Sequence, residues 1–293
     1  MRILIFGGDG MLGHRLLRHL APHHETRVTL RQPLEAYRVF RLFNAANAYD
    51  AVDARDTGRV MQVLARFRPE AVINAAGVIK QRADPNDGVL SVEVNSFFPH
   101  LLARLCRAGG ARLVHLSTDC VFSGGKGNYA ETDRPDPVDV YGFSKLLGEV
   151  DGPGALTLRT SMIGTELARK TGLLEWLLSQ RGKMIKGYRK AIFSGFSTLE
   201  LARVIERLIV EHPRAAGIYH VSSAAISKFD LLSALNAKLG LGVEIVPDDA
   251  VVCDRSLGSA RFKAAFGYAP PSWDAMLNEL AAEIVNETAD KRG

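Results

Sequence analysis

The first twenty residues place a glycine-rich turn directly after a short apolar run, and this feature constrains the fold more than any other. Residues 3–6 read Ile-Leu-Ile-Phe, which is typical of a buried strand. Gly7, Gly10 and Gly13 follow at intervals of three, and the leucines at 12, 16, 17 and 20 recur with helical spacing. The order strand, glycine turn, helix is that of a dinucleotide-binding unit.

The three glycines meet the needs of a phosphate-binding turn. Gly7 allows the tight turn, Gly10 has no side chain to keep a pyrophosphate from the main chain, and Gly13 lets the helix pack closely on the strand. The N–H groups at the start of the helix and the positive end of its dipole would face the phosphates. A purely structural turn is the alternative interpretation.

Short apolar strands and amphipathic helices alternate through the first half of the chain. We expect strands at 27–30, 71–74, 112–116 and 156–159, and helices at 56–67, at 89–107 and from about Tyr141. This alternation predicts an α/β protein of the Rossmann type, with a doubly wound parallel sheet covered by helices on both faces.

The alternation loosens after Arg159. We expect helices over 165–182 and 198–211, a late strand over 217–221, and two or three further helices. We interpret residues 1–160 as an NADP-binding Rossmann domain, completed by residues from about 190–221. Residues 161–293 are then mainly a smaller C-terminal lobe that binds the substrate.

The amino-acid composition argues against several classes of protein, among them membrane-spanning proteins and nucleic-acid binders. Hydrophobic residues make up 47% of the 293 residues and charged residues 24%, as in globular proteins, and no apolar run has the length of a membrane span. The net charge of +5 is scattered rather than clustered, which argues against nucleic acid as a partner. Three dispersed cysteines suit a reducing compartment, so a cytoplasmic location is expected, and no set of residues has metal-ligand spacing.

The residues at the strand ends bear on the choice of dinucleotide. The second strand ends in Leu30-Arg31, where a basic side chain favours the 2′-phosphate of NADP(H) over NAD(H); a solvated loop charge is the alternative. Asp53, followed by Ala54, is expected near the adenine amino group. Ala75, Ala76 and Gly77 leave room for ribose and nicotinamide, although ordinary close packing at a strand end would need the same small residues.

Tyr141 and Lys145 have the spacing of neighbours on one helix face. A free tyrosine titrates near ~10, and a nearby ammonium group stabilises the phenolate, so we expect Lys145 to lower the pKa of Tyr141 toward the working range. Lys145 also has the reach to bind nicotinamide-ribose hydroxyls. Such a pair is otherwise an ordinary surface feature; its place downstream of the glycine turn favours catalysis.

Thr118 lies at the carboxyl end of a predicted strand, where ligands bind in open α/β sheets. Its hydroxyl can donate a hydrogen bond to a substrate oxygen beside Tyr141. The neighbouring Ser117 is the rival for this role.

Three segments together resemble one family. Residues 116–124 (LSTDCVFSG), 129–133 (YAETD) and 137–149 (PVDVYGFSKLLGE) are similar to the dTDP-4-dehydrorhamnose reductase family of extended short-chain dehydrogenases/reductases. The resemblance covers residues 1–165 well and the remainder loosely. It implies NADPH-dependent reduction of the 4-keto group of a nucleotide-activated deoxysugar, for the synthesis of cell-surface polysaccharide precursors.

The resemblance also implies roles for single residues. Thr118, Tyr141 and Lys145 become the catalytic residues, and the glycine turn contacts the pyrophosphate with the main-chain amides of Met11 and Leu12. Asn95, Val121 and Phe122 are expected on the substrate side. Cys120 stands where many members carry an aromatic residue, and Ile79-Lys80-Gln81 also departs from the rhamnose enzymes. Lys80 is a solvated lysine or a phosphate contact, and a UDP-linked N-acetylated sugar is an alternative substrate.

Further alternatives stay open at this point. The basic stretch containing Lys186 and Arg189 is a solvated face or a pyrophosphate clamp, with Arg255 and Arg261 as further candidates. A sugar-nucleotide epimerase that retains NAD, or a non-catalytic NADP-binding regulatory subunit, would use the same scaffold. A homodimer is compatible with the sequence.

Overall fold

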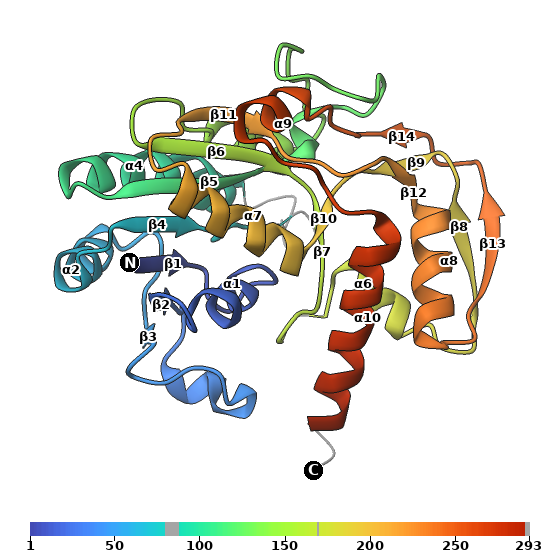
Figure 1. Cartoon of the computed structure of the whole chain (residues 1–293), viewed down its shortest axis with the longest axis horizontal. Coiled ribbons are helices and arrows are strands. Elements are labelled where there is room, and N and C mark those ends of the chain that lie inside the picture. Colours follow the sequence, from blue (N-terminus) through green and yellow to red (C-terminus); the bar gives the residue numbers. More distant parts are fainter. Residues whose placement is uncertain (80–87, 169, 291–293) are drawn as a thin grey trace.

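The computed structural model describes residues 1–79, 88–168 and 170–290. A parallel sheet of seven strands forms its centre (Figure 1). In spatial order the strands are β11 (Gly217–His220), β6 (Ala155–Thr160), β5 (Arg112–Thr118), β4 (Ala71–Asn74), β1 (Arg2–Phe6), β2 (Glu25–Thr29) and β3 (Ala48–Tyr49). The predicted α/β Rossmann-type sheet is confirmed, and its last strand comes from the late segment of the chain.

Helices cover both faces of this sheet because its strands are apolar on both sides. One face packs against α1 (Gly13–Leu20) and α7 (Thr198–Glu211), in a core that includes Ile3, Ile5, Leu16 and Ile205. The opposite face packs α2 (Thr57–Phe67) and α4 (Phe98–Ala108) against Leu4 and Phe6. The short helix α5 (Val140–Leu147) lies beside β5.

The long helix expected over 89–107 is present but contains an irregular turn. It runs as α3 (Gly88–Ser91), a π-helical turn η3 (Val92–Phe97) and α4. Pro99 has no N–H to donate to the carbonyl of Asn95, so the regular hydrogen-bond ladder is interrupted there. This turn points Asn95 and Ser96 inward, where both are buried.

The C-terminal half adds a second lobe beside the sheet (Figure 1). Its strands are β7 (Met162–Ile163), β8 (Met184–Tyr188), β9 (Ala191–Phe193), β10 (Phe196–Ser197), β12 (Ile226–Ser227), β13 (Glu244–Asp248) and β14 (Cys253–Asp254). Its helices are α6 (Leu173–Leu178), α8 (Lys228–Leu239) and α10 (Trp273–Asp290), whereas α9 (Ala260–Phe266) packs against β11 of the central sheet. Leucines of α6, α8 and α10 share one apolar cluster, which gives this lobe a core of its own.

The helix expected over 165–182 is wrong, because among the described residues of this range (165–168 and 170–182) only Leu173–Leu178 is helical. The carboxylate of Glu166 accepts the N–H groups of Thr171 and Gly172 at 2.6 and 2.7 Å, and Gly172 is extended. A side chain that satisfies main-chain donors in this way competes with the helix. After α6, Gly182 has a φ of +69°, and the chain turns into β8. The leucines in this range indicate a buried face, but they do not indicate how long the helix is.

No helix among the described residues combines the length and apolarity needed to cross a bilayer. The smaller elements are the 3₁₀ helices η1 (Leu34–Phe40) and η4 (Asp119–Val121). Both lie in loops at the carboxyl ends of the parallel strands, where the glycine turn also lies.

The close contact at Gly13 gives a test of the glycine turn. A Cβ atom at Gly13 would overlap the carbonyl oxygen of Gly7, so we expect Gly13→Ala to lower the unfolding free energy by about 1–3 kcal/mol, the usual range for overpacking. Gly58→Ala is the matched control, because a Cβ at this exposed position in α2 meets nothing closer than 3.4 Å. It should raise the unfolding free energy by up to about 1 kcal/mol. Urea denaturation measures both; equal effects would contradict the packing role of Gly13.

Candidate active site

The glycine turn has the geometry of a phosphate cradle. Gly7 has a φ of +86°, and a Cβ there would approach the main-chain nitrogen of Ala76 to 2.8 Å. No side chain caps the N-terminus of α1, so no side chain occupies the place where a ligand would approach the start of the helix. An anion of pyrophosphate size suits this position because donors and helix dipole act together. The turn therefore fits the predicted dinucleotide.

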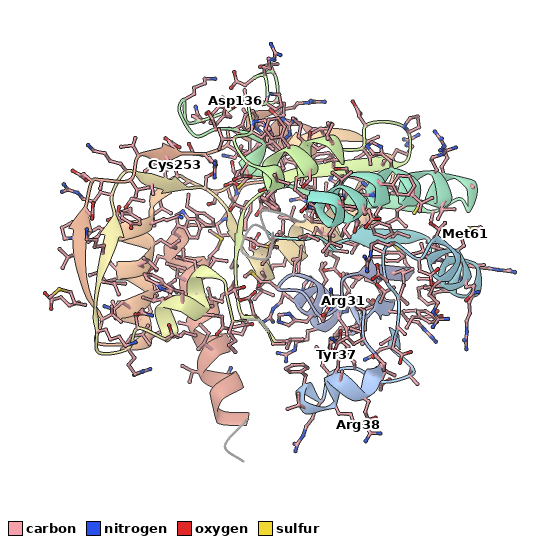
Figure 2. All side chains as sticks on the ribbon, turned by 180° about the vertical axis from the view of Figure 1, so that it is seen from behind. Arg31, Tyr37, Arg38, Met61, Asp136 and Cys253 are labelled. Carbon is pink, nitrogen blue, oxygen red and sulfur yellow. The ribbon has the colours of Figure 1, made fainter. Side chains whose placement is uncertain are left out.

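A cavity of about 410 Å³ lies beside the turn and collects the residues predicted to bind adenosine. Its walls include Gly7, Gly10, Arg31, Asp53, Ala54, Ala75, Ala76 and Gly77. Arg55 binds both oxygens of Asp53 at 2.8–3.0 Å, and this hydrogen bonding lowers the pKa of Asp53. Figure 2 shows Arg31 and Tyr37 close together at this end, with Arg38 farther out.

The hydroxyl of Tyr37 connects the loop after β2 to the glycine turn. It donates to the carboxylate of Asp9 at 3.2 Å and accepts the N–H of Gln32 at 3.3 Å. Burial, followed by the charge of Asp9, raises the pKa of Tyr37, so it stays a donor. The position of the loop that carries Arg31 is thereby tied to the phosphate cradle.

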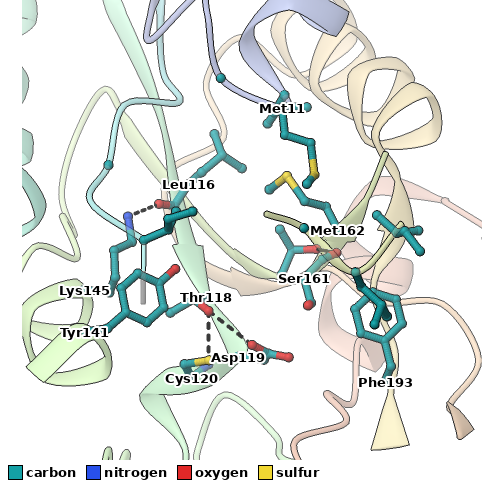
Figure 3. A pocket seen from close by; sticks show the side chains of 18 of the residues that line it. Met11, Leu116, Thr118, Asp119, Cys120, Tyr141, Lys145, Ser161, Met162 and Phe193 are labelled. Atoms are coloured by element: carbon teal, nitrogen blue, oxygen red, sulfur yellow. Dashed lines mark hydrogen bonds between the residues drawn. The ribbon is translucent and has the colours of Figure 1, made fainter. Parts of the chain in front are cut away.

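A larger cavity of about 640 Å³ adjoins the first and shares Asp9, Gly10 and residues 75–78 with it. Thr118, Tyr141 and Lys145 line it together with Met11 and Leu12 of the glycine turn. Figure 3 shows Tyr141 and Lys145 on one side, with Met162 and Phe193 of the C-terminal lobe across from them. The predicted catalytic residues and the predicted cofactor turn thus surround one space.

The short helix α5 carries Tyr141 and Lys145 on one face. Asp139 caps its N-terminus by accepting the N–H of Gly142 at 2.8 Å. Lys145 is buried, and its Nζ donates to the carbonyl oxygen of Leu116 at 2.5 Å. Burial lowers the pKa of Lys145 to about 8, opposed by the negative charge of Glu149.

The expectation that Lys145 makes Tyr141 more acidic is wrong for the chain by itself. Burial raises the pKa of Tyr141, the charges of Cys120 and Asp119 raise it further, and a hydrogen bond with Thr118 acts in the opposite direction. The ammonium of Lys145 is instead bound to Leu116. Tyr141 therefore keeps its proton at neutral pH, which is the state that a proton donor needs.

Thr118 lies at the end of β5 with its hydroxyl held from two sides. Its Oγ1 donates to Oδ1 of Asp119 at 3.1 Å and accepts the N–H of Cys120 at 3.1 Å (Figure 3). The rival Ser117 also lines this cavity, but its hydroxyl donates to Glu149, behind the site, at 2.6 Å. The geometry thus favours Thr118 over Ser117 for contact with a substrate.

A buried ion pair supports the site from behind. Arg159 of β6 holds both carboxylate oxygens of Glu149 at 2.7 and 2.8 Å, and both side chains are at most 6% exposed. Arg159 also donates to His220 of β11 at 3.2 Å, while Ser117 binds Glu149. This network fixes the end of α5 to β5, β6 and β11.

Asn95 does not line the cavity but supports the residues around it. Its Nδ2 donates to the carbonyl of Val78 at 2.9 Å and to the hydroxyl of Ser144 at 3.0 Å, and its Oδ1 accepts the N–H of Val78 at 2.9 Å. Asn95 thus joins the π-helical turn to α5 and to a main-chain segment of the cavity. Lys80 lies outside the described residues.

The other predicted substrate residues do not line the larger cavity. Val121 and Phe122 are fully buried next to it, since η4 packs against α5, and the ring of Phe122 stacks on Tyr129 with centroids 4.2 Å apart. Lys186 of the outer strand β8 pairs with Asp248 at 2.9 Å, and Arg189, directly after this strand, pairs with Asp249 at 2.6 Å. The substrate roles of these four residues stay predictions.

Several lining residues were not predicted from the sequence. Asp119, Ser161, Met162, Phe193, Lys228 and Cys253 line the larger cavity, as does Arg255, which the sequence offered only as one of several cations. Asp119 had a local signal, since it follows Thr118 directly. The residues from the C-terminal lobe had none. No group of three or more metal-ligating side chains occurs among the described residues.

The fold and the site define an extended short-chain dehydrogenase/reductase, with a glycine turn and a tyrosine–lysine pair around one cavity. Within this class, the chain belongs to the family described as RmlD substrate binding domain, whose model matches residues 1–286.

Named relatives agree with this assignment. A dTDP-4-dehydrorhamnose reductase of Salmonella typhimurium is 27% identical over 315 residues, covering 98% of this chain and 99% of the relative. A dTDP-4-dehydrorhamnose reductase of Burkholderia thailandensis is 34% identical over 192 residues, covering 62% of this chain and about half (52%) of that protein. The fold is shared with the crystal structure of dTDP-4-dehydrorhamnose reductase from Bacillus anthracis in complex with NADP, at a TM-score of 0.78, 24% identity and coverage of 96% and 99%.

The buried charge of Lys145 predicts a conflict between stability and function. Its pKa of about 8 in the folded chain lies below the value of 10.5 for a free lysine, so between these pH values the unfolded chain binds more protons and stability rises with pH. At pH 7 the buried charge is therefore destabilising. We expect Lys145→Met to raise the unfolding free energy by about 1–3 kcal/mol at pH 7.

Urea denaturation at pH 7 and pH 10 measures this effect, and the gain should shrink at the higher pH. The control is Lys263→Met on the exposed side of α9, which should change the unfolding free energy by less than about 0.5 kcal/mol. A Lys145→Met protein that is less stable than wild type at both pH values would contradict the prediction.

Proposed function

We propose that the chain is an NADPH-dependent reductase of the 4-keto group of a nucleotide-activated deoxysugar, in the synthesis of cell-surface polysaccharide precursors. The observation that carries the proposal is the meeting of Thr118, Tyr141 and Lys145 in a cavity that adjoins the glycine turn. Relatives that align over nearly the whole chain are named dTDP-4-dehydrorhamnose reductase, which supports the reaction class. A dTDP-linked and a UDP-linked sugar are both compatible with it.

The chain's own residues supply the proton and hold the reactants. When bound, the reduced nicotinamide supplies a hydride to the keto carbon. Tyr141 donates its proton to the carbonyl oxygen, and Thr118 hydrogen-bonds the same oxygen, so the ketone becomes an alcohol. Lys145 binds the ribose hydroxyls, and its positive charge favours the phenolate left on Tyr141 until a proton from solvent replaces the one lost.

The smaller cavity supports NADP(H) as the cofactor, with NAD(H) as the weaker candidate. Arg31 lines this cavity and forms no ion pair with the residues that the structure describes, so its charge is available to a 2′-phosphate. Asp53 is held by Arg55 and is not free to serve as the usual acidic partner of the ribose. We place Asp53 and Ala54 at the adenine.

The C-terminal lobe supplies the wall that would contact the sugar nucleotide. Arg255 and Lys228 are the cations of this lobe that line the larger cavity. Arg255 is fixed by the carbonyl of Phe122 at 2.9 Å and by Sγ of Cys120 at 3.5 Å. We therefore propose Arg255 and Lys228 as the first candidates for binding the anionic substrate. Lys186 and Arg189 stay predictions, with their charges already neutralised by Asp248 and Asp249.

A chemical assay tests the proposed reaction. The purified chain is incubated with NADPH or NADH and with dTDP-, UDP- and GDP-linked 4-keto sugars, and loss of the reduced-nicotinamide absorbance is followed. We expect NADPH to be consumed in equal amount to the ketone, and Tyr141→Phe to lower kcat by about 10²–10⁴-fold with unchanged NADPH affinity, because only the proton donor is removed. Tyr188→Phe in β8, outside the cavity, is the control.

Other outcomes separate the alternatives. An epimerase returns the hydride and converts the sugar without net consumption of NADPH. A regulatory subunit binds NADPH tightly and turns over none of the sugars. A Tyr141→Phe protein that reduces the sugar at the wild-type rate would refute the assignment of Tyr141.

We also propose that the protein is a homodimer in the cytoplasm. Three free cysteines suit a reducing compartment. The outer face of α5 exposes Val140, Phe143 and Leu147, each at least 45% accessible, and Phe97 of the π-helical turn is 62% accessible. A contiguous apolar surface of this kind favours association, and a second copy is the simplest partner.

Sedimentation equilibrium tests this proposal. The wild-type chain should have twice the mass of one chain, and Phe143→Asp should shift the equilibrium to the monomer, because a charge at the centre of the apolar face has no partner there. The control is Val39→Asp, an exposed apolar residue on η1, away from this face. A monomeric wild-type protein would contradict the proposal.

A further inference from the structure

The hydroxyl of Thr118 has one proton, and in this structure that proton is already used in a hydrogen bond. Oγ1 of Thr118 donates this proton to Oδ1 of Asp119 at 3.1 Å. One lone pair of Oγ1 accepts the N–H of Cys120 at 3.1 Å. A hydroxyl has one proton and two lone pairs, so what remains for the cavity is a lone pair. In this state Thr118 can accept a hydrogen bond from Tyr141 but cannot donate one to a substrate oxygen.

The reduction needs the opposite arrangement. As the hydride arrives, negative charge develops on the carbonyl oxygen, and hydrogen-bond donors aimed at that oxygen stabilise it. A lone pair of Thr118 aimed at the same oxygen would repel it. The proton of Thr118 must therefore be released from Asp119 before Thr118 can assist the reaction.

Protonation of Asp119 would achieve this release. A protonated carboxyl group keeps its proton and can donate a hydrogen bond through it to Oγ1 of Thr118. Both lone pairs of Oγ1 are then filled, one by Asp119 and one by the N–H of Cys120. The O–H group of Thr118 can then point only into the cavity, where Tyr141 and the substrate oxygen meet.

We propose, on the basis of the proposed reductase function, that Asp119 is a positioning residue whose protonated carboxyl group turns the hydroxyl of Thr118 into a donor to the reacting oxygen. Asp119 does not itself reach the substrate oxygen in this scheme. The two hydrogen bonds around Thr118 and the position of Asp119 on the cavity wall carry the inference (Figure 3).

The surroundings of Asp119 are consistent with a protonated state. Asp119 is only 9% exposed, and burial raises the pKa of its carboxyl group. Hydrogen bonds from Cys120, Thr118 and Ser161 and the charge of Arg255 act in the opposite direction. No ion pair joins Arg255 to Asp119 among the described residues, so the carboxylate lacks the direct partner that would hold it ionised.

The groups that face Asp119 fix the sign of the pH effect. They are Tyr141 of α5, Cys120 of η4 and Arg255 near β14; burial raises the pKa of Tyr141 and of the Cys120 thiol, so both are neutral in the working range and Arg255 is the charge that matters. The protonated, active form exists below the pKa of Asp119. The rate should therefore fall as the pH rises through that pKa, in addition to the separate loss of the Lys145 charge as the pH rises through about 8.

Two substitutions of Asp119 separate this role from a structural one. Asp119→Asn offers an amide N–H to Oγ1 of Thr118 at every pH. The kcat of this variant should stay within about tenfold of wild type and should lose the part of its fall with rising pH that Asp119 causes. Asp119→Ala removes the donor, and kcat should fall by about 10²-fold, the loss typical of one oriented donor. In a Thr118→Val background, neither change should alter the pH profile further.

Asp136→Asn is the matched control for a carboxyl-to-amide change. Asp136, labelled in Figure 2, accepts the N–H of Ser123 at 2.8 Å and does not line the larger cavity. Its pH profile should equal that of wild type. An Asp119→Asn enzyme that loses as much activity as Asp119→Ala, or that keeps the complete wild-type pH profile, would overturn the proposal.

Infrared spectroscopy gives a readout that does not depend on turnover. The wild-type minus Asp119→Asn difference spectrum should contain the C=O stretch of a protonated carboxyl group at neutral pH, and this band should vanish at higher pH. Its absence would overturn the inference even if the sugar assay succeeds. A wild-type chain that reduces none of the sugars, yet shows the band, would refute the proposed function and leave the state of Asp119 established.

Discussion

A buried ammonium group bound to a main-chain oxygen is the interaction on which the rest of the site depends. Removing a lysine from water is unfavourable unless its charge finds partners. Lys145 has the carbonyl oxygen of Leu116 at 2.5 Å and the negative charge of Glu149 one helical turn along. Because Leu116 belongs to β5, this contact fixes α5 to the central sheet. Tyr141, four residues earlier on the same helix, is thereby held at the carboxyl end of β5 beside Thr118.

Close main-chain contacts keep α5 where this interaction needs it. A Cβ atom at Gly142 would overlap the carbonyl oxygen of Cys120, and one at Gly148 would overlap the carbonyl oxygen of Asn95. Both ends of the helix are therefore pressed against neighbouring main chain, one against η4 and the other against the π-helical turn. The ion pair of Glu149 and Arg159 then secures the region behind the helix. An unfavourable buried charge is tolerated because rigid packing surrounds it.

The parts of the molecule that sequence patterns predicted are those set by local physics. The glycine turn, the alternation of strands and helices, and the spacing of Tyr141 and Lys145 depend on neighbours within a few residues, and the structure has them. The helix over 165–182 failed because Glu166 binds main-chain donors that a helix would need, which an apolar pattern does not reveal. The sequence left Lys186 and Arg189 as a solvated face or a pyrophosphate clamp, because their partners Asp248 and Asp249 are some sixty residues away and lie on the adjoining strand and loop. Arg255 approaches Cys120 only through tertiary packing across 135 positions.

The topology explains why the local patterns meet at one place. From β1 the chain adds β2 and β3 on one side of the sheet, and from β4 it adds β5, β6 and β11 on the other. The crevice between β1 and β4 is the switch point at which open parallel sheets bind ligands. Gly7 follows β1 and Ala75 follows β4, so the phosphate cradle forms there, and β5 delivers Thr118 one strand farther along. A cofactor bound at the switch point would extend toward Tyr141, because the larger cavity continues from the glycine turn to that residue. The C-terminal lobe closes the far side of this cavity with residues that include Met162, Phe193 and Arg255.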